Sequence, residues 1–307
     1  MITRLLHSTG STPTITPRAL CNILAIGLVA LLATAIRARA AAEDSISSTN
    51  ASRYLPWEKG AVRLGGFVAA FDSTVSFGLN NSPGVKINGE DQLGLDSSLS
   101  VFRADAMYRP GKSRRHELDF SFASYDRNGD VTLTRDLTIR GHTYTVGTEV
   151  KSTLDFDIIQ GSYSYALIQS ERMRIALGIG LYVVPLKTGL EFITTRGGSA
   201  SEEGADTTVP LPVIGLRTEF QLLPRLYLNA GIDAFDLEIT GFRGSMLDVF
   251  AGLEYRPWKH LGVGVGYNFT GMHIDSEKSN SDYPGANFVG NVDVNFSGLL
   301  VYGKFSF

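Results

Sequence analysis

Cysteine is almost absent from this sequence, which limits how the chain can be stabilised. The 307 residues include 1 Cys, Cys21, so no disulfide can form within the chain.

The net charge of the chain is also small. The formal value of -3, from 28 Lys plus Arg and 31 Asp plus Glu, provides no basic field of the kind that attracts nucleic acid. We therefore expect no nucleic-acid partner.

Long hydrophobic runs are missing beyond residue 60. No window there contains 18 consecutive apolar residues, which excludes a helical membrane span in that region. The apolar run from Ile23 to Ile36 is about 14 residues long, whereas a spanning helix needs roughly 20. A different role is therefore expected for this run.

The N-terminal residues have the layout of a secretory signal. Arg4 and Arg18 precede the apolar run, and Ala38-Arg39-Ala40 follows it with small residues at the positions that a signal peptidase reads. A retained membrane anchor is the alternative interpretation. The sequence thus predicts three parts: a signal peptide over 1–40, a periplasmic lead-in over 41–60 and one domain over 61–307.

Period-two alternation recurs through this domain. Leu118 and Phe120 alternate with Glu117 and Asp119, and strand geometry sends the two sets to opposite faces. The same division appears over 174–183, 247–256 and 299–307. Together with 33 Gly and 10% aromatic residues, it predicts an all-β protein in which one face contacts lipid and the other water.

Short connections alternate with long polar ones, as in outer-membrane barrels with periplasmic turns and extracellular loops. Tyr108-Arg109-Pro110-Gly111-Lys112 and Arg256-Pro257-Trp258-Lys259 are two of the short ones. The fold class predicted is a single antiparallel transmembrane β-barrel of about ten strands. The strands are expected over 61–74, 97–109, 114–127, 150–167, 172–186, 208–222, 225–239, 245–256, 260–274 and 293–307, and the long outward loops over 75–96, 128–149, 187–207 and 275–292.

Two details of this strand assignment are less regular. The second long loop is itself β-like, so the third and fourth strands can continue as a hairpin above the membrane, and a count of twelve strands stays open. Within 154–167 the apolar positions change from even to odd numbers, which indicates a β-bulge near Ile158. A soluble β-sandwich shows similar alternation, but the export signal and the regular order of short and long connections favour a barrel.

The segment Tyr302-Gly303-Lys304-Phe305-Ser306-Phe307 resembles the last strand of small opacity-type bacterial outer-membrane barrels. This resemblance implies a place in the bacterial outer membrane, contact with outer-membrane lipid, and recognition by the barrel-assembly machinery through the strand that ends in Phe307. It names no activity and leaves the oligomeric state open.

The strand faces opposite the apolar ones carry charged side chains, which are expected to line the lumen. Their signs nearly balance, so they can pair across a narrow barrel as a salt-bridged plug, or they can line a narrow polar pore. The predicted lumen-lining residues are Arg63, Arg103, Asp105, Glu117, Asp119, Arg174, Arg217, Glu219, Asp233, Asp248, Glu254, Arg256 and Lys304.

Seven aromatic residues are predicted to gather at the periplasmic side of the barrel. There they suit an interfacial girdle better than a ligand site. They are Tyr54, Trp57, Tyr108, Tyr227, Tyr255, Trp258 and Phe307.

Catalytic residues are not evident. Barrel proteases of the omptin type use acidic and Asp-His pairs, and His273-Ile274-Asp275 is the closest approach here, with His273 on the outward phase of its strand. A Ser-His arrangement is not visible at fixed spacing. Because the mature chain has no Cys and its His residues are isolated, we expect no metal and no cofactor.

The function expected is that of an outer-membrane barrel with a structural role or restricted passage of a small solute, not an enzyme. The alternatives are a barrel enzyme acting on lipid or peptide at the cell surface, and adhesion or ligand binding by the long loops, especially 128–149 and 187–207.

Overall fold

A computed structural model describes residues 57–77, 86–139, 142–193, 201–239, 242–276 and 290–307. The predicted signal peptide and most of the predicted lead-in lie outside these residues.

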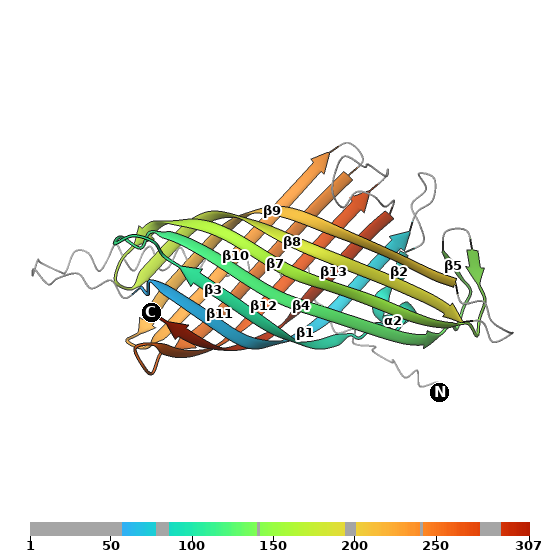
Figure 1. Ribbon diagram of the computed structural model, residues 1–307, viewed down its shortest axis with the longest axis horizontal. Helices are drawn as coiled ribbons and strands as arrows, with labels where there is room; N and C mark the ends of the chain where they lie inside the picture. The colour runs from blue at the N-terminus through green and yellow to red at the C-terminus, as the bar shows by residue number, and fades with distance from the viewer. Residues whose placement is uncertain (1–56, 78–85, 140–141, 194–200, 240–241, 277–289) are drawn as a thin grey trace, which may run out of the picture. The chain divides into compact units, whose positions relative to one another are not determined.

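The described residues form a closed antiparallel barrel of ten strands (Figure 1). Each strand pairs with the next along the chain, and β13 returns to pair with β1 from Ala61↔Ser306 to Phe77↔Gly290. The prediction of ten strands is confirmed, and the barrel does not have twelve. Its strands are β1 (Gly60–Phe77), β3 (Ser98–Tyr108), β4 (His116–Thr132), β7 (Glu149–Gln169), β8 (Met173–Ile193), β9 (Ser201–Leu223), β10 (Leu226–Ile239), β11 (Phe242–Tyr255), β12 (Leu261–Ser276) and β13 (Gly290–Ser306).

Small elements lie at one end of the barrel, which we call the outer end because the longer connections lie there. β2 (Lys86–Asn88) pairs with β1, and α2 (Gly89–Leu93) follows it. β5 (Leu137–Ile139) and β6 (His142–Tyr144) form a separate hairpin between β4 and β7. The inner end has the short turns. Among the described residues, no helix is long and apolar enough to cross a membrane.

The outward face of the inner half of the barrel is an apolar band. Large hydrophobic side chains are exposed there on strand after strand, with Ile179 and Ile214 each 66% exposed. A single such residue is ordinary on a protein surface, but a continuous ring of them is not. The apolar band includes Leu64, Val68, Phe102, Leu118, Phe120, Tyr163, Leu177, Ile179, Leu181, Ile214, Leu253, Val263, Val265, Leu299 and Val301.

The outer half of the barrel reverses this pattern, because there the apolar side chains point inward and the polar ones outward. A buried cluster, which we call the outer core, fills the interior at this level. It includes Phe67, Phe71, Tyr125, Val150, Leu154, Phe156, Tyr182, Leu190, Phe192, Leu211, Val213, Met246, Ile274 and Phe296.

Strand β7 shows how one strand serves both halves. Phe156 and Ile158 are buried in the outer core, whereas Tyr163 and Tyr165 are exposed on the apolar band. The pairing with β4 runs without a shift from His116↔Tyr165 to Thr132↔Glu149. The bulge predicted near Ile158 is therefore wrong, and the register shift with β8 lies between Ala166 and Ile168 instead. The apolar side chains change face because the surroundings change from lipid to water, not because the strand changes phase.

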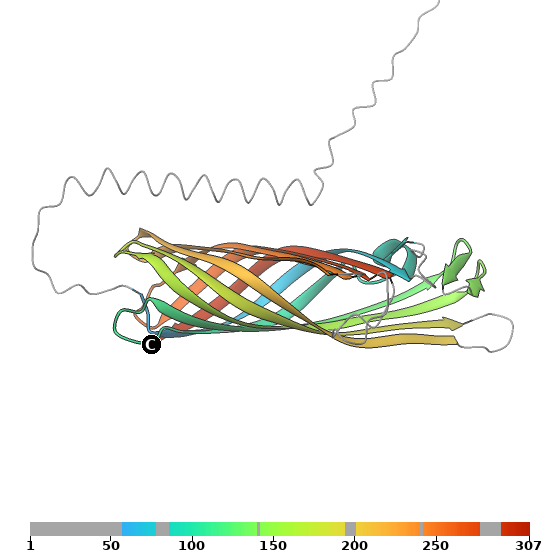
Figure 2. The ribbon, with the colours of Figure 1, turned by 90° about the horizontal axis from the view of Figure 1, so that it is seen from above.

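Several strands are also longer than predicted, because they continue into the outer half, where polar side chains point outward. β8 continues to Ile193 and β9 begins at Ser201, so much of the expected loop 187–207 is a paired extension of the wall, as seen at the outer end in Figure 2. β4 and β7 continue in the same way, which confirms the predicted hairpin above the membrane.

Candidate functional site

The interior of the inner half holds charged side chains in contact with one another. Nearest the inner end, Lys304 Nζ lies 3.0 Å from Glu254 Oε1 and also contacts Glu58. Arg256 Nη1 lies 2.8 Å from Glu58 Oε2, and its guanidinium stacks 3.8 Å from the centre of the Tyr227 ring. Glu58, which precedes the first strand, therefore belongs to the lumen. Sequence reasoning missed it because it lies outside any alternating segment.

A second group of ion pairs lies beside the first. Arg174 Nη1 is 2.9 Å from Glu117 Oε2 and 3.4 Å from Glu219 Oε1. Arg109 donates hydrogen bonds to both carboxylates and is 2% exposed. Arg109 was interpreted as part of a turn, and its position in a short connection gave no sign that its side chain enters the barrel.

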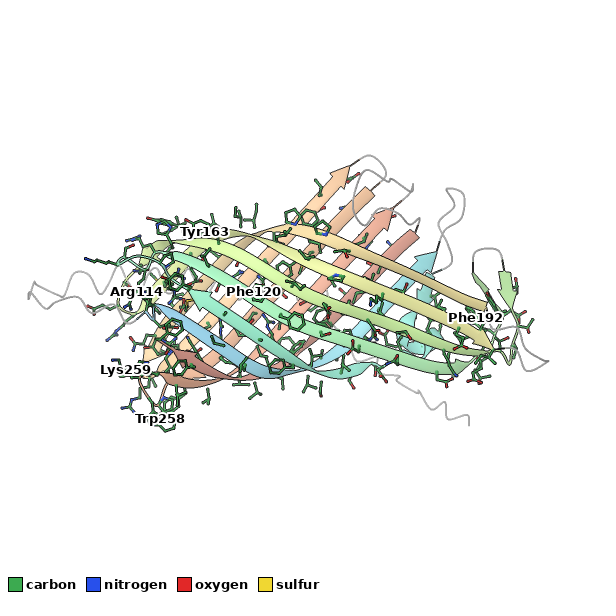
Figure 3. All side chains as sticks on the ribbon, viewed as in Figure 1. Arg114, Phe120, Tyr163, Phe192, Trp258 and Lys259 are labelled. Atoms are coloured by element: carbon green, nitrogen blue, oxygen red, sulfur yellow. The ribbon has the colours of Figure 1, made fainter. Side chains whose placement is uncertain are left out.

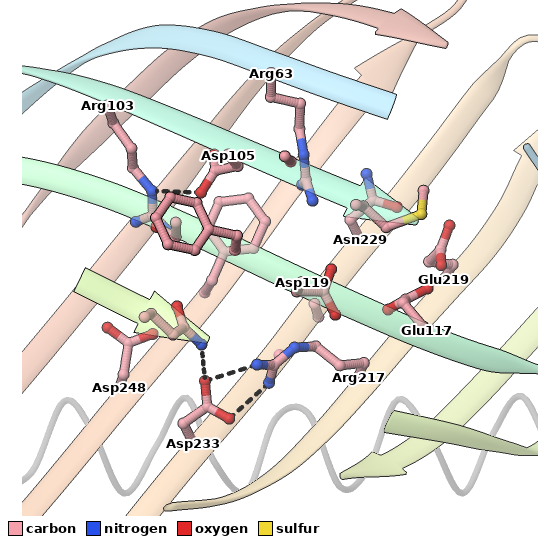
Figure 4. A pocket seen from close by; sticks show the side chains of 18 of the residues that line it. Arg63, Arg103, Asp105, Glu117, Asp119, Arg217, Glu219, Asn229, Asp233 and Asp248 are labelled. Carbon is pink, nitrogen blue, oxygen red and sulfur yellow. Dashed lines mark hydrogen bonds and ion pairs between the residues drawn. The ribbon is translucent and has the colours of Figure 1, made fainter. Parts of the chain in front are cut away.

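The middle of the lumen holds a chain of hydrogen bonds. Arg103 Nε lies 3.1 Å from Asp105 Oδ1 (Figure 4). Arg103 Nη1 donates to Asn268 Oδ1 at 3.0 Å. Asn268 Nδ2 donates to Asp248 Oδ2 at 3.0 Å. Arg63 on β1 is the register partner of Asp105 on β3. Its guanidinium lies 5.9 Å from the centre of the Tyr302 ring.

Asp233 accepts four hydrogen bonds from three side chains at the same level. Arg217 reaches it through Nη1 and Nη2 at 2.7 and 2.9 Å, the Tyr182 hydroxyl at 2.8 Å and Gln160 Nε2 at 3.2 Å. Asp233 is 4% exposed, so its charge is held by these donors and not by bulk water.

A cavity of about 120 Å³ remains among these charges. It is large and polar enough to hold water molecules. Towards the outer end an aromatic cluster of the outer core follows. Tyr125 stacks on Phe156 with ring centres 4.7 Å apart, and Phe71 lies 5.3 Å from Phe296. The lumen is therefore filled first by paired charges and then by aromatic rings.

The structure places the predicted lumen-lining residues on the inward faces of their strands and brings them together in the groups described above. Most of them border the cavity, and Arg174, Glu254 and Arg256 take part in the ion pairs at the inner end.

The predicted aromatic girdle is partly wrong. Trp57 is fully buried, donates its indole N–H to the Ser170 carbonyl at 2.9 Å and packs edge-on against Tyr227, which also points inward. Their side chains close the inner end. Tyr108, Tyr255, Trp258 and Phe307 are exposed, and Figure 3 shows Trp258 and Lys259 at this end of the barrel. Tyr54 lies outside the described residues.

The outward face also carries a His-carboxylate pair. His273 Nδ1 on β12 lies within hydrogen-bond distance of Asp293 Oδ1 on β13, and the two residues are register partners. On its other side, His273 is the register partner of Ser245 on β11. Directly opposite residues of antiparallel strands point to the same face, so Ser245, His273 and Asp293 form a row. Sequence spacing could not reveal this row because each residue comes from a different strand.

Asp275, which the sequence analysis paired with His273, is the register partner of Arg243 and of Asn291 instead. Within the described ranges, no group of three or more His, Cys, Asp and Glu side chains is placed to hold a metal ion.

An antiparallel barrel whose inner half presents an apolar band to its surroundings is suited to a bilayer. The ladders of that half are closed and leave no backbone edge in the hydrocarbon, and the band contacts the acyl chains. The protein is an outer-membrane β-barrel.

Neither a family model nor a curated protein matches the sequence. The fold is similar to several solved barrels. They include the outer membrane protease OmpT from Escherichia coli, with 11% identity and a TM-score of 0.49 over 85% of this chain and 100% of that chain. Ail, the attachment invasion locus protein of Yersinia pestis, has 12% identity and a TM-score of 0.33 over 80% and 99%. Neisserial surface protein A has 14% identity and a TM-score of 0.31 over 80% and 99%. Because these scores are below 0.5, the assignment to the outer membrane rests on the barrel itself.

Proposed function

We propose that this outer-membrane barrel is a closed structural protein that does not conduct solutes and that carries a β-structured extension above the membrane. The observation behind the proposal is the double filling of the lumen, with paired charges in the inner half and the outer core beyond them.

Each layer opposes passage for a different physical reason. An ion that enters the inner half must displace charges that already neutralise one another, such as Lys304 with Glu254 and Arg217 with Asp233. Beyond the cavity it meets the rings of Tyr125 and Phe156, where neither water nor a counter-charge replaces its hydration shell.

Planar-bilayer recording on the folded mature protein tests this proposal. Folding is first shown by a gel shift that disappears on boiling, and a general porin in the same membrane serves as the positive control. We expect no steady conductance from the folded sample. A reproducible single-channel step would contradict the proposal and make Arg103, Arg217 and Glu254 the first residues to substitute.

The row Ser245, His273 and Asp293 favours a second candidate function, hydrolysis of an ester at the outer surface of the wall. Asp293 holds the Nδ1 side of the imidazole, which leaves Nε2 to take the proton from the Ser245 hydroxyl as its oxygen attacks the ester carbonyl. The imidazolium would then protonate the leaving alcohol, and water activated by the same imidazole would release the acyl group. Leu247 lies two positions from Ser245 on the outward face, so lipid esters are the substrates within reach.

This candidate is tested with a long-chain p-nitrophenyl ester and with phospholipid in mixed micelles. Activity that is lost in Ser245→Ala and His273→Ala but retained in Ser100→Ala, a substitution of an exposed serine on β3, supports hydrolysis. Equal rates in the parent and in Ser245→Ala remove it, and the proposal of a closed structural barrel is unaffected by that result.

A further inference from the structure

The wall of the barrel is open between β9 and β10 towards the outer end. Their pairing stops at Ile214↔Ala234, although β9 extends outward as far as Ser201 and β10 as far as Ile239. Beyond that point β9 pairs only with β8, and β10 only with β11. In both Figure 1 and Figure 2 the outer ends of β9 and β10 lie apart.

Two prolines explain why the wall does not close. Pro210 and Pro212 lie in the free part of β9, just outward of Ile214, and both take part in the unbroken pairing with β8. A proline fits within a ladder only where its nitrogen faces away from the paired neighbour, so both missing N–H groups fall on the edge towards β10. That edge lacks the donors needed to continue the ladder.

A pocket of about 820 Å³ lies at the opening. Its lining combines lipid-facing side chains, among them Ile179, Leu181 and Ile214, with the inward-facing Val213 and Phe235. Val213 belongs to the outer core and Phe235 packs against it, so the pocket joins the apolar band to the barrel interior.

The opening lies at the outer boundary of the apolar band. Ile214, at the last rung of the β9–β10 ladder, is 66% exposed on the lipid-facing side. The next outward residues on β10 are charged, and the side chains of Asp236 and Glu238 are 64% and 74% exposed. This change from apolar to charged residues is expected where the outer-leaflet acyl chains meet the headgroups.

We propose that the opening between β9 and β10 binds the acyl chain of an outer-leaflet lipid, with the chain end against Phe235 and Val213. The pocket is continuous with the surface that already contacts lipid, so an acyl chain reaches it without crossing water. An added peptide strand is a poorer occupant, because the β9 edge offers no N–H at Pro210 or Pro212. The site reaches the outer core through Val213 and lies apart from the ion pairs of the inner half, so it does not depend on whether the barrel conducts.

Tryptophan quenching by lipids brominated on their acyl chains tests the site. The variants are Phe235→Trp at the opening, Val265→Trp on the apolar band away from the pocket and Phe296→Trp in the outer core, each in vesicles after subtraction of the Trp57 and Trp258 signal. We expect the residue at position 235 to be quenched nearly as strongly as that at 265, and the residue at 296 to stay unquenched. Quenching at 235 no greater than at 296 overturns the proposal, whether the opening is then filled by water or by a peptide strand.

A closing variant adds a second readout. Pro210→Thr with Pro212→Thr restores both N–H donors. It should let the β9–β10 ladder grow outward and remove the quenching at position 235 while leaving that at 265 unchanged. Pro185→Thr on β8 is the control substitution away from this edge and should leave both unchanged. Quenching at 235 that persists in the double variant, with the gel shift of a folded barrel retained, contradicts the assignment of the site to this opening.

Discussion

Arg217 and Asp233 form a two-pronged ion pair between β9 and β10, with N–O distances of 2.7 and 2.9 Å, beside the last rung of the ladder that joins these strands. The pair therefore holds the wall together where the opening begins. Because the Asp233 side chain is 5% exposed and that of Arg217 is 21% exposed, solvent screens the attraction only partly.

Asp233→Asn should destabilise the barrel, because the Arg217 charge would lose its partner inside the lumen. Loss of one member of a buried pair costs about 3 to 5 kcal/mol. Arg217→Met with Asp233→Leu should cost clearly less than the single change, because neither charge remains. Arg217→Met and Asp233→Leu, each measured alone, complete the double-mutant cycle, and urea unfolding in detergent is followed by the gel shift of the folded form. If the double variant loses as much as the sum of these two single variants, the two side chains are not coupled.

Gly264 and Gly303 offer a matched pair of substitutions on adjacent strands. A Cβ at Gly264 would overlap the Tyr302 ring inside the lumen, whereas a Cβ at Gly303 meets nothing within 4 Å. Gly264→Ala should therefore lower the free energy of unfolding by about 1 to 3 kcal/mol, as overpacking does, and Gly303→Ala should leave it nearly unchanged. The same urea titration compares the two variants, and equal losses would contradict the inward assignment of Gly264.

The sequence predicts the ten strands because their alternation follows directly from a wall between lipid and lumen. It also places charged residues such as Arg103 and Glu254 on the inward faces, where the structure has them. The sequence does not predict which charged residues pair. Whether Arg174 contacts Glu117 or Asp105 depends on the register and shear between strands far apart in sequence, and neither can be derived from the sequence of one strand.

The errors in strand assignment have a physical cause. An analysis of period-two alternation assumes that the apolar face of a strand stays the same along its length. In β7 the same positions point inward throughout, but the outward face contacts lipid in the inner half and water in the outer half. Phe156 therefore points into the outer core while Tyr163 points to lipid. The bulge near Ile158 was inferred from that change of surroundings, whereas the loop over 187–207 was inferred from its polar composition. Glu58 and Arg109 escaped detection because they enter the lumen from outside the strands.

The change of surroundings is itself testable with arginine substitutions along β8. Leu177→Arg on the apolar band should cost about 2 to 4 kcal/mol if it lies near the middle of the bilayer. Phe192→Arg should cost at least as much, since Phe192 is fully buried in the outer core. Glu191→Arg, next to it on the outward face, should be nearly neutral. Refolding yield into vesicles ranks the three variants, and a large loss for Glu191→Arg would contradict the proposed boundary between the two halves.

Glu90 on α2 should make the outer end sensitive to acid. It accepts hydrogen bonds from the Ser73 N–H at 2.9 Å, the Ser73 hydroxyl at 2.7 Å and Arg127 Nη2 at 2.6 Å. Burial acts to raise the pKa of Glu90, but these hydrogen bonds outweigh it and lower the pKa below its usual value. The contacts tie α2 to β1 and β4 above the outer core.

A carboxyl with a lowered folded-state pKa stabilises the structure fully above the pKa of the unfolded chain, about 4.3, and that contribution is lost as the pH falls through the folded value. Glu90→Gln should therefore reduce stability by about 1.5 to 3 kcal/mol at pH 7, and the difference from the parent should shrink only below about pH 4. Asp91→Asn, on the exposed side of the same helix, is the matched control and should show little change. Amide exchange of α2, measured from pH 7 to pH 3, follows the loss locally. A difference between Glu90→Gln and the parent that stays constant through pH 3 would show that the charge of Glu90 does not hold α2 in place.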